Sequence, residues 1–302
     1  MRAGAAAPRR RGWSTAGDYF GLVKFEHTVF ALPFALIALL VATGGRPSRR
    51  VLLGVLVAMI AARSAAMAFN RLADRDYDAR NPRTADRHLP AGRIGVAGAV
   101  TFTAASALIF VLAARTLNPL CFALAPVALT VVLGYSYAKR FTPWSHLVLG
   151  LGLGIAPTGA WLAATGHFAA FPLWLSAGVM LWVGGFDAIY GCQDVEIDRR
   201  EGLRSLAVRF GVPGALGIAK GLHVLAVLCL AIAFRTAPAF GVTADLGLCA
   251  RLGLVAMTLL LIWEHRLVRG GDLRRIDRAF FTINSWIGML LLLFVACDIY
   301  LV

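Results

Sequence analysis

Charged residues are scarce in this chain. Only 15% of its 302 residues are Asp, Glu, Lys or Arg, whereas 59% are hydrophobic, and the mean hydropathy is +0.73. The apolar residues come in long runs and not in the narrow stripes of amphipathic surface helices. These properties exclude an ordinary soluble domain and predict a membrane protein.

Cysteine pairs with the spacing of metal or redox motifs are also missing. The five cysteines show no C-x-x-C spacing, and four of them lie within apolar runs. Free cysteine in such surroundings behaves as a small apolar side chain. We therefore interpret the cysteines as packing residues.

Nine apolar runs are long enough, or nearly so, to cross a hydrocarbon core, which takes about 20 residues of helix. Lipid leaves backbone groups no water to bond, so segments this apolar are expected to be helices and not the alternating strands of a barrel. The sequence predicts an all-α polytopic membrane protein, a bundle of nine transmembrane helices. The predicted spans are 25–43, 51–69, 94–114, 117–134, 144–165, 168–186, 213–234, 244–263 and 280–301.

The chain contains no Ser/Gly-rich linker, so we expect one membrane domain over residues 25–302. The composition of residues 1–24 favours a short, basic cytoplasmic tail. An arginine-rich start that is poor in acidic residues also suits a mitochondrial transit peptide, which is the alternative for this segment.

Lys and Arg gather in the N-terminal tail and in the loops after the second, fourth, sixth and eighth spans. By the positive-inside bias these segments are cytoplasmic. We expect a cell (inner) membrane protein whose active-site cavity faces the cytoplasm. The net charge of +14 reflects this topology and an attraction to anionic lipid headgroups, so no nucleic-acid partner is expected.

Two of the cytoplasmic loops, residues 70–93 and 187–212, are longer than a connection needs. Each follows an even-numbered span, and each opens with acidic residues four positions apart. The two loops therefore have the form of an internal repeat, and we expect them to serve one site.

The first loop begins "NRLADRDYD". A helix continued from the second span would place Asn70, Asp74 and Asp78 on one face, at about 100° per residue. Arg63, inside the span, falls on the same face within an arc of roughly 80°, whereas Asp76 points to the other side. An ionisable residue inside a span is expensive and by default functional.

The second loop contains "DVEID". A helix continued from the sixth span would place Asp187, Asp194 and Asp198 within an arc of roughly 40°, with Glu196 on the opposite face. Carboxylates that converge on one site repel each other unless cations lie between them. Oxygen ligands in this arrangement suit Mg²⁺, which binds carboxylates together with substrate phosphates.

Basic residues that could bind phosphate lie on the same side of the membrane. "YSYAKR" places Tyr135 and Lys139 four apart at the cytoplasmic end of the fourth span, and the long loops add Arg71, Arg83 and Arg204. Arg and Lys are the usual partners of diphosphate oxygens. A metal and diphosphate centre at the mouth of an apolar bundle indicates a substrate with an anionic head and a lipid tail.

These motifs resemble those of the UbiA superfamily of intramembrane aromatic prenyltransferases, namely an NDxxDxxxD-type motif, a YxxxK motif and a DxxxD motif. The resemblance covers nearly the whole chain, although Arg71 stands where many members have Asp. It implies nine helices and transfer of a polyprenyl group from polyprenyl diphosphate to a small aromatic acid, with release of diphosphate. The chain looks most like 4-hydroxybenzoate polyprenyltransferases, so 4-hydroxybenzoate is the expected acceptor, in ubiquinone-type quinone biosynthesis.

The resemblance further implies two Mg²⁺ ions that bridge the diphosphate. Their ligands would be Asn70, Asp74, Asp78, Asp194 and Asp198. The catalytic residues would be Asp74, Asp194, Lys139 and Tyr135. The diphosphate would also contact Arg71, Lys139, Arg83 and Arg204.

The acceptor is expected on the membrane side of this centre. Arg63 and Lys24 are candidates for its carboxylate, and Asp187 is a third candidate for contact with the acceptor. Lys24 at the start of the first span is equally well interpreted as an interfacial anchor.

Other functions remain open at this level. Within the same superfamily, a naphthoate acceptor in menaquinone biosynthesis is the rival of 4-hydroxybenzoate. A membrane transporter would also be all-α, but its charges should lie near mid-membrane and not gather at one surface. The oligomeric state and the prenyl chain length are left open by the sequence.

Overall fold

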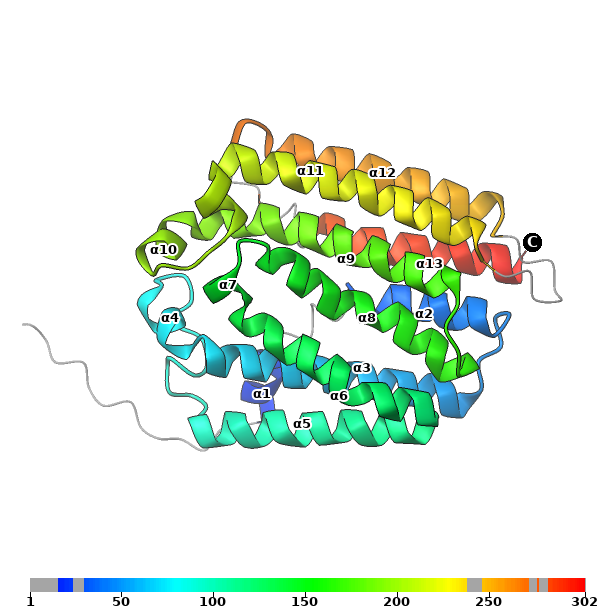
Figure 1. The fold of residues 1–302 in the computed structure, drawn as a ribbon, viewed down its shortest axis with the longest axis horizontal. Helices are drawn as coiled ribbons and strands as arrows, with labels where there is room; N and C mark the ends of the chain where they lie inside the picture. Colours follow the sequence, from blue (N-terminus) through cyan, green and yellow to red (C-terminus); the bar gives the residue numbers. More distant parts are fainter. Residues whose placement is uncertain (1–15, 24–29, 238–245, 272–275, 277–281, 302) are drawn as a thin grey trace, which may run out of the picture.

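The computed structural model describes residues 16–23, 30–237, 246–271, 276 and 282–301, and every regular element within these ranges is a helix. The long helices run side by side along one axis, and short helices gather at one end of the bundle (Figure 1). The expectation of an all-α fold is confirmed.

Among the residues that the structure describes, seven helices are long and apolar enough to cross a membrane, two of them counted together with the short helices that follow them. The protein is therefore an integral, multi-pass membrane protein, as predicted. These helices are α3 (Arg49–Ala73), α5 (Val96–Leu117), α6 (Pro119–Gly134), α8 (Ser145–Thr165), α9 (Ala170–Gly191), α11 (Leu206–Arg235) and α12 (Leu248–Leu267).

Two shorter apolar helices, α2 (Leu32–Ala42) and α13 (Asn284–Tyr300), fall within the first and ninth predicted spans. They adjoin residues 24–29 and 277–281, which lie outside the described residues. Nine spans therefore stay a prediction. A further helix, α1 (Ala16–Val23), lies in the segment assigned to the tail and contacts α3.

Local sequence accounts for where several helices begin and end. Ser48 caps α3, where its hydroxyl accepts a hydrogen bond from a backbone N–H, and Asn118 caps α6 in the same way. Gly166 ends α8 in the left-handed conformation. In α11, Gly211 has φ 70° and interrupts the helix two residues before Pro213, so the predicted span that starts at residue 213 corresponds only to the part after this kink.

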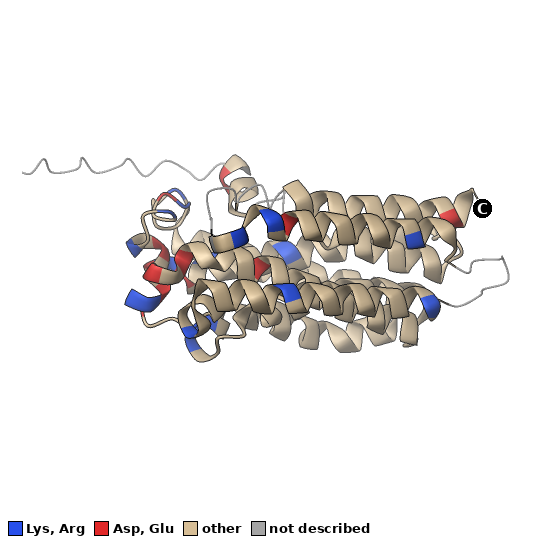
Figure 2. Ribbon diagram, turned by 90° about the horizontal axis from the view of Figure 1, so that it is seen from above, with Lys and Arg blue, Asp and Glu red and all other residues tan. Residues whose placement is uncertain are grey.

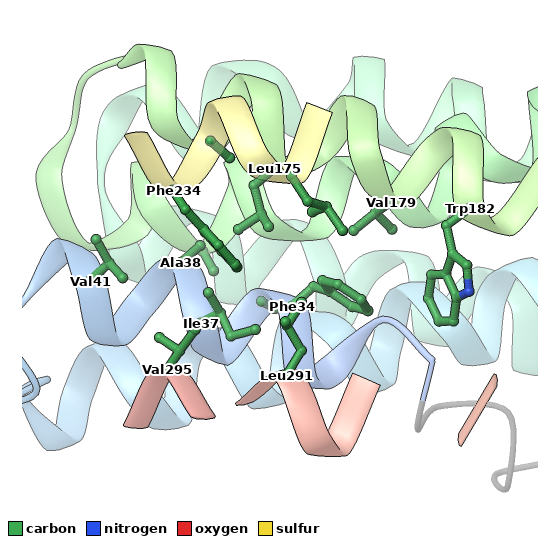
Figure 3. Packing of buried hydrophobic residues seen from close by; sticks show 14 of the residues in the cluster. Phe34, Ile37, Ala38, Val41, Leu175, Val179, Trp182, Phe234, Leu291 and Val295 are labelled. Carbon is green, nitrogen blue, oxygen red and sulfur yellow. The ribbon is translucent and has the colours of Figure 1, made fainter. Parts of the chain in front are cut away.

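The main core is formed largely by α2, α8, α9, α11 and α13, and α2 packs against α8, α9 and α13. Phe34 of α2 packs on Trp182 of α9 with ring centroids 5.1 Å apart, and both side chains are fully buried. Figure 3 places Leu175 and Val179 on the α9 side of this cluster and Leu291 and Val295 on the α13 side. This packing fixes α9, which leads into the second acidic loop.

The short elements lie together at one end of the bundle, where α4, α7 and α10 are neighbours in Figure 1. They are α4 (Arg75–Arg80), η2 (Tyr135–Tyr137), α7 (Ala138–Phe141), η3 (Cys192–Asp194) and α10 (Val195–Arg200). Most acidic residues gather at this end, together with many of the basic ones (Figure 2). The predicted convergence of the two acidic loops is therefore present in the fold.

Candidate active site

Both acidic loops contain a helix break of the same shape. Asp74 separates α3 from α4 with φ −99° and ψ 9°, and Asp194, the last residue of η3, precedes α10 with φ −98° and ψ 6°. The expectation of uninterrupted helices is thus wrong at these two positions. Helical bonding nevertheless continues across the first break, because Asp74 N donates to Asn70 O at 2.9 Å and Asp78 N donates to Asp74 O at 2.7 Å.

The predicted facing of the acidic residues survives these breaks. Asp78 in α4 and Asp198 in α10 are 6% and 2% exposed, respectively. Asp76 and Glu196, the acids that the helical geometry directed away, are both exposed. In each loop, therefore, the aspartate four residues after the break (Asp78 or Asp198) points inward. The acidic residue two positions before it (Asp76 or Glu196) points outward.

The carboxylates of the first loop are balanced by arginines. Arg87 Nη1 donates to Asp78 Oδ1 at 2.6 Å. Arg140 Nη2 of α7 lies 3.5 Å from Asp74 Oδ1 and also donates to the carbonyl of Ala73 at 2.6 Å. Arg140 therefore holds α7 against the end of α3 as well as supplying charge.

The carboxylates of the second loop take their partners from other elements. Arg83 of the first loop contacts Asp194 with Nη2 2.6 Å from Oδ2, and Lys139 Nζ of α7 lies 3.0 Å from Asp198 Oδ2. At the rim, Arg80 pairs with Glu201 at 2.7 Å. The two acidic loops and α7 thus form one charged network.

Charge in this network is not fully compensated at Asp74. Burial raises the pKa of the Asp74 carboxyl above its ordinary value, and the neighbouring Asp78 adds to the rise, which Arg140 only partly offsets. Burial lowers the pKa of Arg83, but Asp194 outweighs this and the net pKa is raised. The charged form of Arg83 is therefore stabilised by Asp194.

The donor set suits a hard divalent cation. In the described part of the chain, no three His, Cys, Asp or Glu side chains converge as a preformed metal cluster. Among these residues, however, Asp78 Oδ2 is buried without a hydrogen-bond donor, and the amide of Asn70 orients Asp74 Oδ2 at 2.9 Å. These all-oxygen ligands fit Mg²⁺, which takes few protein carboxylates and fills its shell with water and phosphate.

A cavity of about 570 Å³ adjoins this network and runs between α3, α5, α6, α8 and α9. Its walls are apolar, and Arg63 is the one charged residue among the described residues that line it. Arg63 Nε is buried and has no hydrogen-bond partner within the described structure. Tyr135 also lines the cavity, one helical turn before Lys139, so the cavity begins beside the charged network.

Asp187 is held by a histidine. His146 Nδ1, near the start of α8, lies 2.7 Å from Asp187 Oδ2. The histidine side chain is 2% exposed, whereas the Asp187 side chain is 22% exposed. The pair therefore presents the carboxylate from a fixed, buried support.

Residues 31–286 of the chain match the UbiA prenyltransferase family. The chain belongs to this family. The 4-hydroxybenzoate octaprenyltransferase of Shewanella woodyi is 30% identical to this UbiA-family chain over 94% of it and 97% of the relative. That of Alkalilimnicola ehrlichii is 32% identical over 97% of each chain.

Solved UbiA structures share this fold. A UbiA homologue from Aeropyrum pernix has a TM-score of 0.80 and 31% identity, covering 90% of this chain and 98% of its own. A UbiA homologue from Archaeoglobus fulgidus, solved with GPP and Mg²⁺, has a TM-score of 0.73 and 20% identity over 93% of this chain and 99% of its own. The second likeness concerns the fold alone.

Most of the residues singled out from the sequence lie in the charged network or line the adjoining cavity. Arg71 is buried, and its Nη1 lies 3.4 Å from Asn70 Oδ1 and 4.0 Å from Asp78 Oδ2, so a cation occupies the position where many members have Asp. Arg204 instead donates to the carbonyl of Phe141 at 2.7 Å, which ties its loop to α7. Lys24 lies outside the described residues.

Two residues that contact predicted site residues, Arg140 and His146, were missed from the sequence. Arg140 was not distinguished from the basic residues that set topology, although it follows the YxxxK lysine directly. His146 was not considered because it stands alone in an apolar segment. Its partner Asp187 comes from another helix, so only the packing of α8 on α9 reveals the pair.

Proposed function

We propose that this chain transfers a polyprenyl group from polyprenyl diphosphate to 4-hydroxybenzoate, with formation of a carbon–carbon bond ortho to the hydroxyl group and release of diphosphate. The observation that carries the proposal is the pair of equivalent acidic loops at the mouth of an apolar cavity of about 570 Å³. Relatives named 4-hydroxybenzoate octaprenyltransferase, at about 30% identity over most of the chain, support this acceptor.

The proposed cofactor is Mg²⁺, with two ions that bridge the diphosphate. Asn70, Asp74 and Asp78 would hold one ion, and Asp194 and Asp198 the other. The Archaeoglobus fulgidus protein of the same fold, solved with GPP and Mg²⁺, supports a metal-bound diphosphate at this site. When bound, Mg²⁺ would offset the charge that develops on the leaving diphosphate.

The chain's own cations would bind the donor from the sides. Arg71 and Lys139 lie next to the inward carboxylates and would contact diphosphate oxygens. Arg83 and Arg204 are proposed for the same role. The donor's carbon–oxygen bond breaks and its electron pair leaves with the diphosphate, and the ring carbon of the acceptor supplies the pair for the new bond before it loses its proton.

The cavity would exclude water from the reacting carbon. Tyr135 lies where the apolar cavity meets the charged network and would position the diphosphate or the allylic carbon. The apolar walls bind the tail and protect the cation-like carbon from quenching by solvent. No nucleophilic side chain is needed, because the acceptor ring itself attacks.

The acceptor carboxylate is proposed to bind Arg63, with Asp187 and Lys24 as further contacts. Arg63 is buried in the cavity wall with an unused Nε donor, which a carboxylate would satisfy. Replacement of Arg63 by Glu should raise the KM for the acceptor at least tenfold with little effect on the KM for the donor. An unchanged acceptor KM would refute this assignment.

The proposed orientation places the charged end in the cytoplasm of a nine-span protein of the cell (inner) membrane. The concentration of Lys and Arg in loops at this end supports it. Labelling of single cysteines introduced at Asp76 and at Gly166, on opposite ends of the bundle, would test it in intact cells.

The deciding experiment is prenyl transfer by the purified protein in lipid, with geranyl diphosphate and either 4-hydroxybenzoate or a dihydroxynaphthoate, with and without Mg²⁺. We expect the prenylated 4-hydroxybenzoate only with Mg²⁺. A prenylated naphthoate alone would move the enzyme to the menaquinone pathway. Absence of both product and diphosphate release would contradict the proposed reaction.

A further inference from the structure

A second cavity of about 830 Å³ lies between α11 and α12, which run side by side in Figure 1. It shares no lining residue with the cavity beside the acidic loops. Its apolar walls include Val224 and Leu228 of α11 and Leu261 and Ile262 of α12. The proposed reaction leaves this α11/α12 groove without a role.

Three basic side chains line the same groove, namely Lys220, Arg266 and Arg269, and all three are exposed. None of them forms an ion pair with another residue in the described ranges. In the active site, by contrast, Arg87 and Lys139 are each paired with an inward carboxylate. Within the described residues, the groove therefore combines unpaired basic side chains with an apolar trough.

The groove has a polar end and an apolar end. Arg269 follows the C-terminal end of α12, and the adjacent Val268 belongs to the same buried cluster as Cys192 and Leu206 of the second acidic loop. Lys220 precedes Leu228 by about 12 Å along α11. The cations thus lie toward the charged end of the bundle, and the apolar walls extend from there into the span.

The inner wall of the groove carries two hydrogen-bonded histidines. His265 lines it, and its Nε2 lies 3.0 Å from Nδ1 of the buried His223. His223 Nε2 in turn lies 3.2 Å from the carbonyl oxygen of Trp182 in α9. An occupant of the groove would therefore contact a wall that is connected to α9.

We propose that the α11/α12 groove binds an anionic phospholipid of the surrounding bilayer. The headgroup phosphate would contact Lys220, Arg266 and Arg269, and one acyl chain would lie along Val224 and Leu228. Basic pockets between transmembrane helices bind anionic headgroups, and the unpaired charge here matches that chemistry. The site does not depend on which acceptor the enzyme uses.

The test compares binding of phosphatidylglycerol and phosphatidylcholine to the purified full-length protein, by native mass spectrometry and by thermal unfolding. Wild-type protein should retain phosphatidylglycerol and gain thermal stability from it more than from phosphatidylcholine. Each cation near an anionic lipid strengthens binding roughly fivefold, so the triple replacement of Lys220, Arg266 and Arg269 by Gln should weaken it about a hundredfold.

Two further variants test the cations and the apolar trough separately. The double replacement of Arg235 and Arg251 by Gln, at the opposite ends of the same two helices, is the matched control and should leave phosphatidylglycerol binding unchanged. Val224→Trp should block the trough while all three cations remain, and should also weaken binding. If the triple variant does not fold, this second variant alone decides.

Three results of these binding measurements would overturn the proposal. They are equal binding of the two lipids by the wild-type protein, equal losses in the triple variant and its matched control, and full stabilisation by inorganic phosphate without lipid. A fourth is a competition result: if geranyl diphosphate displaces bound phosphatidylglycerol more effectively than added phosphatidylglycerol does, the groove would be a site for the prenyl donor.

Discussion

Asp74 and Asp194 adopt the same backbone conformation, with φ −99°, ψ 9° and φ −98°, ψ 6°. Each residue immediately precedes a six-residue helix, α4 or α10, whose fourth residue is a buried aspartate. Because the two loops are equivalent in geometry, under the proposed function they would present matching oxygen ligands from two sides of one site. The diphosphate of a substrate would bind between them.

This equivalence predicts matched effects of substitution. Asp74→Ala and Asp194→Ala should each lower prenyl transfer at least about a hundredfold, because each removes an oxygen that stabilises the leaving diphosphate. Asp76→Ala and Glu196→Ala, at the exposed positions between the inward residues, should stay within about threefold of wild type. Initial rates at saturating Mg²⁺ measure all four. Equal losses at Asp74 and Asp76 would contradict the proposed facing.

Arg83 and Arg80 provide a second matched pair in the first loop. Arg83 contacts Asp194 at 2.6 Å and Tyr190 Oη at 3.3 Å, whereas Arg80 forms a rim pair with Glu201. Arg83→Ala should raise the KM for the prenyl diphosphate about tenfold or more, because a charge-assisted contact is lost next to a metal ligand. Arg80→Ala should change it less than about twofold. A comparable rise in both would show that only the overall charge of the loop matters.

Much of the fold could be predicted from the sequence because a membrane span needs only a long apolar run. The predicted span 144–165 nearly coincides with α8, Ser145–Thr165. The start of α11 was missed because it precedes a kink at Gly211, where the apolar run is weak. Hydropathy reports membrane-spanning length and is insensitive to such flanking turns.

The candidate site could be predicted in part, because four-residue spacing puts side chains on one face of a helix. Asp78 and Asp198 face inward as expected even though each helix breaks at the preceding aspartate, Asp74 or Asp194. The pairs Arg140–Asp74 and His146–Asp187 could not be predicted, since each joins elements that are distant in the sequence. Such pairs depend on helix packing, which single-sequence periodicity does not encode.

His146 is expected to act as a positioning residue for Asp187. His146→Ala should raise the KM for the aromatic acceptor about tenfold and leave the KM for the prenyl diphosphate within about twofold, because Asp187 loses the partner that fixes it. His146→Asn, which can still donate a hydrogen bond, should recover part of the loss. Steady-state kinetics with each substrate varied in turn separate the two constants. A purely structural role would instead lower thermal stability and affect both substrates alike.

The close approach of α8 and α9, which positions His146 against Asp187, depends on a glycine. A Cβ atom at Gly150 would lie 2.2 Å from the backbone oxygen of Met180, and the backbone of α9 cannot yield as a flexible side chain would. Gly150→Ala should therefore force the helices apart at a cost of about 1–3 kcal/mol, lowering the unfolding temperature and the activity together. Gly159→Ala on the same helix meets no atom within 4 Å and should raise stability slightly, since alanine is the better helix former. Thermal unfolding followed by tryptophan fluorescence compares the two variants, and a Gly150→Ala protein as stable as Gly159→Ala would mean that α8 and α9 do not pack this closely.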